Sequence, residues 1–236
     1  MEHLESPIKL SVTWLADLAE CVCDRCYWIA YHLPPPLPSQ IPSVVRDIDR
    51  QTRRAVTASL QRHGRLPDWH PVVGDVKSVV PDARLRPRQF QLLDEGNGVL
   101  LRGRPDVVFE LADGSYHIVD YKATRPPHSG PPPKRYRIQL NAYALVAEAV
   151  GLKPVSGLSL VFLQAGPLLQ ARKAPYAALR FDAQRHDVAL NPARWVQPLL
   201  RRASRVLRQR RPPAPHPECT DCRELKRWAR HLLSTR

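Results

Sequence analysis

The segment 99–122 constrains the fold more than any other part of the chain, because it contains three short apolar runs and one tight turn. Asp113-Gly114 stands between the second run and the third. An Asp-Gly pair between two such runs is a strong signal for a β-hairpin, because glycine accepts the positive φ that the turn requires. We therefore predict strands at 99–102, 106–111 and 116–122, with the last two paired as a hairpin.

Asp120 and Lys122 are two residues apart on the last of these strands. Side chains at positions i and i+2 share one face of a strand, so an acid and an amine are held side by side. The hairpin would bring Asp106 close to both. Two carboxylates at one strand face suit Mg²⁺ or Mn²⁺, and a neighbouring ammonium can orient a water molecule or neutralise charge on a phosphate. A solvent-exposed ion pair on an edge strand would produce the same Asp-x-Lys triplet.

Outside this segment the sequence alternates between helical and extended patterns. Apolar residues at helical spacing predict helices at 11–20, 43–63, 135–150 and 191–210, with a short final helix after the last cysteine. Two further strands are predicted at 158–164 and 177–182, whereas 66–98 shows only broken strands or loop. The proline-rich stretches are too short to separate large domains. The sequence thus predicts one α/β domain with a central mixed sheet flanked by helices.

Four of the five cysteines form two Cys-x2-Cys pairs near opposite ends of the chain, Cys23/Cys26 and Cys219/Cys222. Together they supply four thiolates, which complete a tetrahedral metal site or hold an iron–sulfur cluster. Free buried cysteines, which behave as small apolar residues, are the alternative interpretation. We expect the fifth, Cys21, not to be a ligand. In a reducing compartment, cysteines at this spacing indicate metal or redox chemistry rather than disulfides.

The chain is strongly basic, with 36 Lys and Arg against 22 Asp and Glu and a formal net charge of +14 at pH 7. This charge suits a polyanionic partner, of which nucleic acid is the first candidate. Arginines gather on the predicted helices 43–63 and 191–210, and either helix could follow a phosphate backbone or simply face solvent. The sequence has no apolar run long enough to span a membrane and no apolar segment near Met1, so we expect a cytoplasmic protein without membrane association.

Three motifs in this chain resemble those of the PD-(D/E)XK nuclease superfamily, in particular its RecB-like branch. They are Gly103-Arg-Pro-Asp106, Asp120-Tyr-Lys122 and, on the helix that follows, Gln139-Leu-Asn-Ala-Tyr143. The resemblance implies a restriction-endonuclease-like core in which Asp106, Asp120 and the carbonyl of Tyr121 hold Mg²⁺ or Mn²⁺. It also implies that Lys122 assists the attacking water, while Gln139 and Tyr143 support the site and the DNA strand. Such nucleases often add an acid from an upstream helix, for which Asp49 is the first candidate and Asp47 the second.

The cysteine pattern is similar to that of RecB-like nucleases with an iron–sulfur cluster, such as the CRISPR-associated adaptation exonucleases. That family commonly uses one N-terminal and three C-terminal cysteines, whereas the split here is two and two. The resemblance implies a 4Fe–4S cluster held by Cys23, Cys26, Cys219 and Cys222, and the different split leaves zinc as the alternative. We expect the terminal segments 11–31 and 212–236 to form a metal-binding subregion of a single nuclease domain, 1–236.

The expected function is divalent-metal-dependent hydrolysis of DNA, by an exonuclease or an enzyme that processes single-stranded ends. Partner proteins of a DNA repair, recombination or defence system are expected. One alternative is a catalytically silent DNA-binding or adaptor module with the same fold, against which the intact Asp106, Asp120 and Lys122 argue. A second alternative is a zinc-stapled protein interaction domain in which the Asp-x-Lys triplet is incidental.

Overall fold

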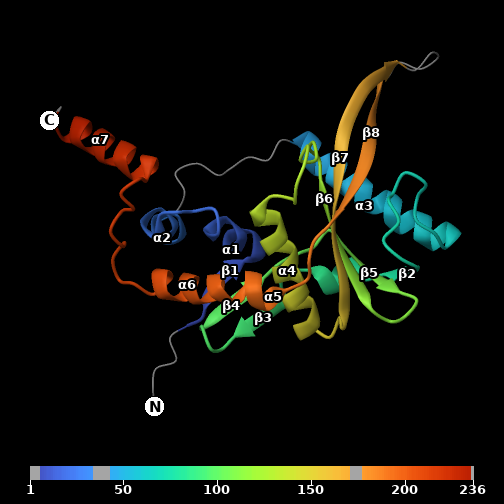
Figure 1. The fold of residues 1–236 in the computed structure, drawn as a ribbon, viewed down its shortest axis with the longest axis horizontal. Helices are drawn as coiled ribbons and strands as arrows, with labels where there is room; N and C mark the ends of the chain where they lie inside the picture. Colours follow the sequence, from blue (N-terminus) through green and yellow to red (C-terminus); the bar gives the residue numbers. More distant parts are fainter. Residues whose placement is uncertain (1–5, 34–42, 171–176, 235–236) are drawn as a thin grey trace.

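The computed structural model describes residues 6–33, 43–170 and 177–234 as a mixed α/β fold (Figure 1). Its strands are β1 (Ile8–Ser11), β2 (Val76–Val79), β3 (Gln91–Asp94), β4 (Val99–Arg102), β5 (Val107–Leu111), β6 (Tyr116–Lys122), β7 (Val155–Gln170) and β8 (Ala177–Asp187). Its helices are α1 (Val12–Leu18), α2 (Asp24–His32), α3 (Ser43–His63), α4 (Lys134–Ala149), α5 (Pro192–Trp195), α6 (Gln197–Leu207) and α7 (Thr220–Ser234), with a 3-10 turn, η1 (Asp82–Leu85). No helix within these ranges is long and apolar enough to cross a membrane.

The central element is a five-stranded mixed sheet in the order β2-β5-β6-β7-β8. β5 and β6 form an antiparallel hairpin in which Val107 lies opposite Val119. The chain leaves β6, passes through α4 and returns as β7, parallel to β6, a crossover that usually requires a helix. β7 and β8 are antiparallel and extend beyond the rest of the sheet as a two-stranded arm (Figure 1). The predicted hairpin and mixed sheet are confirmed.

β6 lies in the middle of this sheet and is buried on both faces. Ile118 points to the face that is covered by α4, where it joins the larger core. Val119 points to the other face and packs in a second cluster with Val56 of α3. Because side chains alternate along a strand, Asp120 and Lys122 share the α4 face with Ile118.

A second sheet of three strands, in the order β1-β4-β3, completes the core. β1 pairs in parallel with β4, so that Ile8 lies opposite Val99. α1 begins directly after β1, and its N-cap Ser11 accepts a hydrogen bond from the backbone N–H of Trp14 at 3.1 Å. Apolar side chains of α1, α4 and α6 meet in one large core. The N-terminal elements are thus packed against α6, which lies far along the chain.

Some elements differ from their predicted bounds. β7 and β8 are longer than the predicted strands 158–164 and 177–182. The added residues after Gln164 show no apolar alternation, so the sequence gives no signal for a strand there. The predicted helix 191–210 is interrupted at Val196 and forms α5 and α6. Pro198 has no backbone N–H to donate to the carbonyl of Arg194, which prevents a continuous helix. The predictions do not include β1, β2, β3 or α2; these strands are four residues long, too short for a periodic pattern.

Candidate active site and cysteine group

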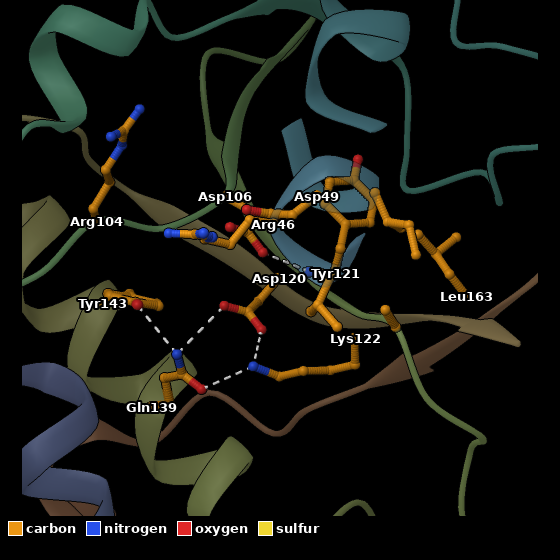
Figure 2. Close-up of a pocket in the computed structure, with 13 residues that line it drawn as sticks. Arg46, Asp49, Arg104, Asp106, Asp120, Tyr121, Lys122, Gln139, Tyr143 and Leu163 are labelled. Carbon is orange, nitrogen blue, oxygen red and sulfur yellow. Dashed lines mark hydrogen bonds and ion pairs between the residues drawn. The ribbon is translucent and has the colours of Figure 1, made fainter. Parts of the chain in front are cut away.

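A pocket of about 250 Å³ at the end of β6 gathers residues from the first two motifs (Figure 2). Asp106 lies just before β5, and its Oδ2 accepts a hydrogen bond from the backbone N–H of Tyr121 at 2.8 Å. Asp120 comes from β6 and is only 3% exposed. Lys122 follows on the same face of the strand, with its Nζ 2.5 Å from Oδ2 of Asp120. The structure therefore places both acids and the lysine in one pocket.

Gln139 and Tyr143 reach this pocket from α4, where they lie one helical turn apart. Lys122 Nζ donates to Oε1 of Gln139 at 3.2 Å. Nε2 of Gln139 donates to the Tyr143 hydroxyl at 3.1 Å and to Oδ1 of Asp120 at 3.4 Å. An ammonium can only donate and a carboxylate can only accept, so this orientation of the amide satisfies both neighbours. Gln139 thus joins the acid, the lysine and the tyrosine into one network.

Gly103 allows Tyr143 to pack against the loop that carries Asp106. A Cβ atom at position 103 would lie 2.6 Å from Cε1 and 3.0 Å from Cδ1 of Tyr143. Carbon atoms that are not bonded prefer about 3.5–4.0 Å between them, so a side chain at position 103 would displace the ring. Burial raises the pKa of Tyr143, so its hydroxyl stays protonated. The glycine of the first motif and the tyrosine of the third therefore form one packing unit.

Asp49 lines the same pocket from α3. Its carboxylate accepts a hydrogen bond from the guanidinium of Arg53, one turn along the helix, at 2.8 Å. Asp47 is exposed, pairs with Arg50 and does not line the pocket. Of the two upstream acids that the resemblance suggests, the structure brings Asp49 to the site.

The carboxylates of this pocket are poorly solvated and lie close to one another. Burial raises the pKa of Asp106 well above its usual value, and the charges of Asp120 and Asp49 add to the shift. Burial also raises the pKa of Asp120, although the adjacent ammonium of Lys122 opposes this shift. Desolvation and like-charge repulsion both disfavour the ionised form of a carboxyl group. A divalent cation would offset both effects, and carboxylate oxygens are the ligands that Mg²⁺ and Mn²⁺ prefer. The residues present therefore fit a divalent metal ion.

Two side chains outside the motifs also contact this site. The ring of Tyr136 lies next to Lys122, whose Nζ is 4.4 Å from the ring centroid, a cation–π contact. Tyr136 is three residues before Gln139, so its helical spacing is a signal that could have indicated it. His70 accepts a hydrogen bond from the Tyr121 hydroxyl at Nε2, at 2.9 Å, while its Nδ1 donates to a backbone carbonyl at 2.7 Å. No sequence signal links His70 to a tyrosine 51 residues away.

The two cysteine pairs meet where α2 approaches the start of α7 (Figure 1). Their four Sγ atoms all lie within 4.8 Å of one another. Cys26 Sγ lies 3.4 Å from that of Cys222 and 3.5 Å from that of Cys219, and Cys23 Sγ lies 3.7 Å from that of Cys222. Cys21 is outside this group, and its thiol donates to the carbonyl of Cys23 at 3.2 Å. The prediction that the terminal pairs come together is confirmed.

Arg202 of α6 holds the segment that leads into the cysteine group. Its guanidinium donates to Oδ1 of Asp24 at 2.8 Å, to the carbonyl of Leu18 at 2.9 Å and to the carbonyl of Cys21 at 2.8 Å. An arginine whose donors are used inside the protein is not available to a phosphate backbone. At this position α6 therefore stabilises the fold rather than offering a basic surface.

A family model described as the PD-(D/E)XK nuclease superfamily matches residues 11–226, a span that contains all three motifs and both cysteine pairs. No curated protein matches the chain. Among solved structures, one described as "Crystal structure of SSO0001" is 14% identical, with a TM-score of 0.40, over 88% of this chain and 80% of that chain. A likeness this distant carries no argument about fold or function.

Proposed function

The chain belongs to the PD-(D/E)XK nuclease superfamily, and on that premise we propose that it is a divalent-metal-dependent nuclease that hydrolyses phosphodiester bonds of DNA. The convergence of Asp106, Asp120 and Lys122 in one pocket is the observation that carries the proposal. Free or single-stranded ends are the proposed substrate, as the resemblance to the RecB-like branch implies. An intact set of acids and lysine favours activity over a catalytically silent module.

We propose that Asp106, Asp120 and the carbonyl of Tyr121 hold Mg²⁺ or Mn²⁺, with Asp49 as the additional acid. When bound, such an ion would neutralise charge on the scissile phosphate and lower the pKa of a water molecule. The raised pKa values of Asp106 and Asp120 support this assignment, because each carboxyl gains from a nearby cation. The backbone N–H of Tyr121 keeps the Asp106 carboxylate oriented toward β6.

The remaining residues of the network position the attacking water and the strand. The ammonium of Lys122 is held between Asp120 and Gln139, so one of its protons can be directed at the water or at a phosphate oxygen. Gln139 acts as a positioning residue, because its one amide hydrogen-bonds both Lys122 and Asp120 and so fixes where they lie. Tyr143 anchors that amide through its hydroxyl.

The cysteine group is proposed as a structural metal centre that joins the terminal segments 11–31 and 212–236 of one nuclease domain, 1–236. Four thiolates bonded to one ion at about 2.3 Å would lie about 3.8 Å apart in a tetrahedron. Three of the Sγ separations are 3.4–3.7 Å, which fit one such ion, for example zinc. The resemblance to iron–sulfur nucleases supports the larger 4Fe–4S cluster instead, which would spread the sulfur atoms further.

Metal analysis of anaerobically purified protein separates these two occupants of the cysteine group. A brown protein with absorbance at about 400 nm and several irons per chain identifies the cluster. A colourless protein with one zinc per chain identifies the single ion. Loss of the bound metal in a Cys222→Ser variant would place either occupant at this group, whereas an unchanged metal content would exclude the cysteines as its ligands.

A digestion assay on end-labelled single-stranded and double-stranded DNA, with Mg²⁺ or Mn²⁺, tests the catalytic assignment. We expect Asp106→Ala and Lys122→Ala to reduce cleavage by at least about 100-fold, the scale of losing one positioned catalytic group. Asp49→Ala and Asp47→Ala form a matched pair from one helix, and only the first should reduce cleavage. Lys122→Ala protein that cuts as fast as wild type would overturn the assignment. Wild-type protein that binds DNA but cuts with neither metal would establish the adaptor alternative.

A further inference from the structure

A groove of about 1190 Å³ lies beside the active-site pocket, between α3 and the segment formed by β2 and η1. Four residues line both cavities: Arg46, Asp49, Arg104 and Asp106. The groove therefore opens directly into the pocket, and Figure 2 shows Arg46 beside Asp106. A ligand bound along α3 would reach the acidic site without leaving the protein surface.

The groove is positively charged along its length. Six basic side chains line it: Arg46, Arg50, Arg53, Arg54, Lys77 and Arg104. Asp49 and Asp106 belong to the active site, and among the described lining residues Asp82 is the one further acid. Once a metal ion neutralises the active-site acids, the groove presents an almost entirely positive surface to a ligand.

The basic side chains on α3 are arranged as a stripe. The apolar side of this helix, which includes Val56, packs against the sheet, and the arginines occupy the side that faces the groove. Positions 46, 50, 53 and 54 recur at helical spacing, so they lie along one face. From Arg46 to Arg54 the helix rises about 12 Å, at about 1.5 Å per residue. A stripe of that length can contact consecutive phosphates of one strand.

Two of these arginines are available for a ligand. Arg50, Arg53 and Arg104 each form an ion pair with an aspartate, and Lys77 pairs with Glu110 at 2.6 Å. Arg46 and Arg54 form no ion pair with any residue in the described ranges and are exposed. Neither guanidinium is paired with a carboxylate in the part of the chain that the structure describes, so both can bind an external anion.

We propose that this groove binds the phosphodiester backbone of one nucleic acid strand and leads it into the acidic pocket, an inference that rests on the proposed nuclease function. The pocket has a volume of about 250 Å³, below the range of about 300–1,000 Å³ for sites that enclose a drug-sized ligand, so it has room for part of one strand and not for a duplex. The described residues that line the groove include no aromatic side chain on which bases could stack. Binding is therefore through phosphates, independent of base sequence and strongly dependent on salt.

Fluorescence anisotropy with a labelled oligo(dT) strand in EDTA measures this binding without cleavage. Arg54→Glu and Arg62→Glu form a matched pair: both lie on α3 and change the net charge equally, but Arg62 does not line the groove. We expect Kd to rise about tenfold for Arg54→Glu and less than about twofold for Arg62→Glu. The slope of log Kd against log salt should fall by about 0.7 for each phosphate contact that is lost.

A second variant, Lys77→Ala, tests the opposite wall of the groove and should also weaken binding. Equal effects of Arg54→Glu and Arg62→Glu would overturn the groove as the binding site, whatever the nuclease activity. A labelled duplex that binds as tightly as oligo(dT), with the same dependence on Arg54, would overturn the single-strand assignment. Binding that requires Arg54 in a wild-type protein that never cuts would refute the proposed nuclease function and leave the groove in place.

Discussion

A Gly103→Ala variant should distort the active site without removing any group that contacts substrate. The new Cβ would lie 2.6 Å from Cε1 of Tyr143 and 3.0 Å from Cγ2 of Val12. Both neighbours are buried, so the ring must shift rather than rotate into solvent. Because the Tyr143 hydroxyl accepts a hydrogen bond from Gln139, a shifted ring would also displace Gln139 and, through its amide, Lys122.

The expected cost follows from this overlap. Extra carbon atoms in a well-packed core cost about 1–3 kcal/mol. In a protein of this size each kcal/mol corresponds to about 2–4 °C, so the melting temperature should fall by about 2–12 °C. Displacing a positioning residue by about 1 Å can lower the rate about 100-fold. We therefore expect a folded, moderately destabilised protein whose cleavage is far weaker than its stability would suggest.

Thermal denaturation and the digestion assay measure the two effects of Gly103→Ala. Gly96→Ala is the matched control, because the nearest atom to its new Cβ is Oδ1 of Asp94 at 3.6 Å, an ordinary contact. In a Tyr143→Ala background the ring is absent, so Gly103→Ala should destabilise the protein much less than it does in wild type. A double-mutant cycle measures this difference. A Gly103→Ala protein that melts and cuts like wild type would refute the reasoning. An equal cost in both backgrounds would show that the tyrosine ring is not the cause.

Three further predictions concern charge and pH. Burial raises the pKa of Asp106, so its ionised carboxylate destabilises the folded state at pH values above the usual pKa of an aspartate. Asp106→Asn should therefore raise the melting temperature of metal-free protein near pH 7. Mn²⁺ should stabilise wild type but not this variant. Tyr136→Leu should slow single-turnover cleavage about 2- to 30-fold, because a cation–π contact with Lys122 is worth about 0.5–2 kcal/mol. Tyr136→Phe keeps the ring and should cut like wild type. Equal cleavage rates for Tyr136→Leu and Tyr136→Phe would exclude a role for the contact. Burial lowers the pKa of His117 to about 4, so stability should fall by about 3 kcal/mol as pH falls from about 6.5 toward that value. Urea unfolding at several pH values should show a smaller fall for His117→Gln than for wild type.

The elements that the sequence predicts well are those whose bounds depend on neighbouring residues. β4, β6 and α3 have the predicted bounds, 99–102, 116–122 and 43–63, because apolar spacing, turn residues and proline positions mark both ends of each. β1 is different. Its four residues form a strand because Ile8 pairs with Val99, and nothing near Ile8 in the sequence indicates that partner.

The candidate site likewise has residues that local sequence patterns predict and residues that only the packing of distant segments brings in. The motif residues on β6 and α4 follow from a strand and a single helical turn, so their spacing places Asp120 beside Lys122 and Gln139 beside Tyr143. α3 and the 66–74 loop pack against the other face of the sheet, so that Asp49 lines the pocket and His70 contacts the Tyr121 hydroxyl. The family resemblance and the Arg-rich helix made Asp49 the first candidate and Asp47 the second, and the cavity that brings Asp49 to the other acids exists only in the folded chain.

By itself the sequence determined the hairpin, the three motifs and the two cysteine pairs, because strands, turns and short spacings are decided by interactions between near neighbours. The tertiary structure alone decided that Gly103 makes room for Tyr143. It also decided that arginines of α3 line a groove beside the active-site pocket, whereas Arg202 of α6 is bound to Asp24 and two carbonyls. Burial, charge pairing and shared cavities depend on segments that are distant in sequence, and only the folded chain brings those segments together.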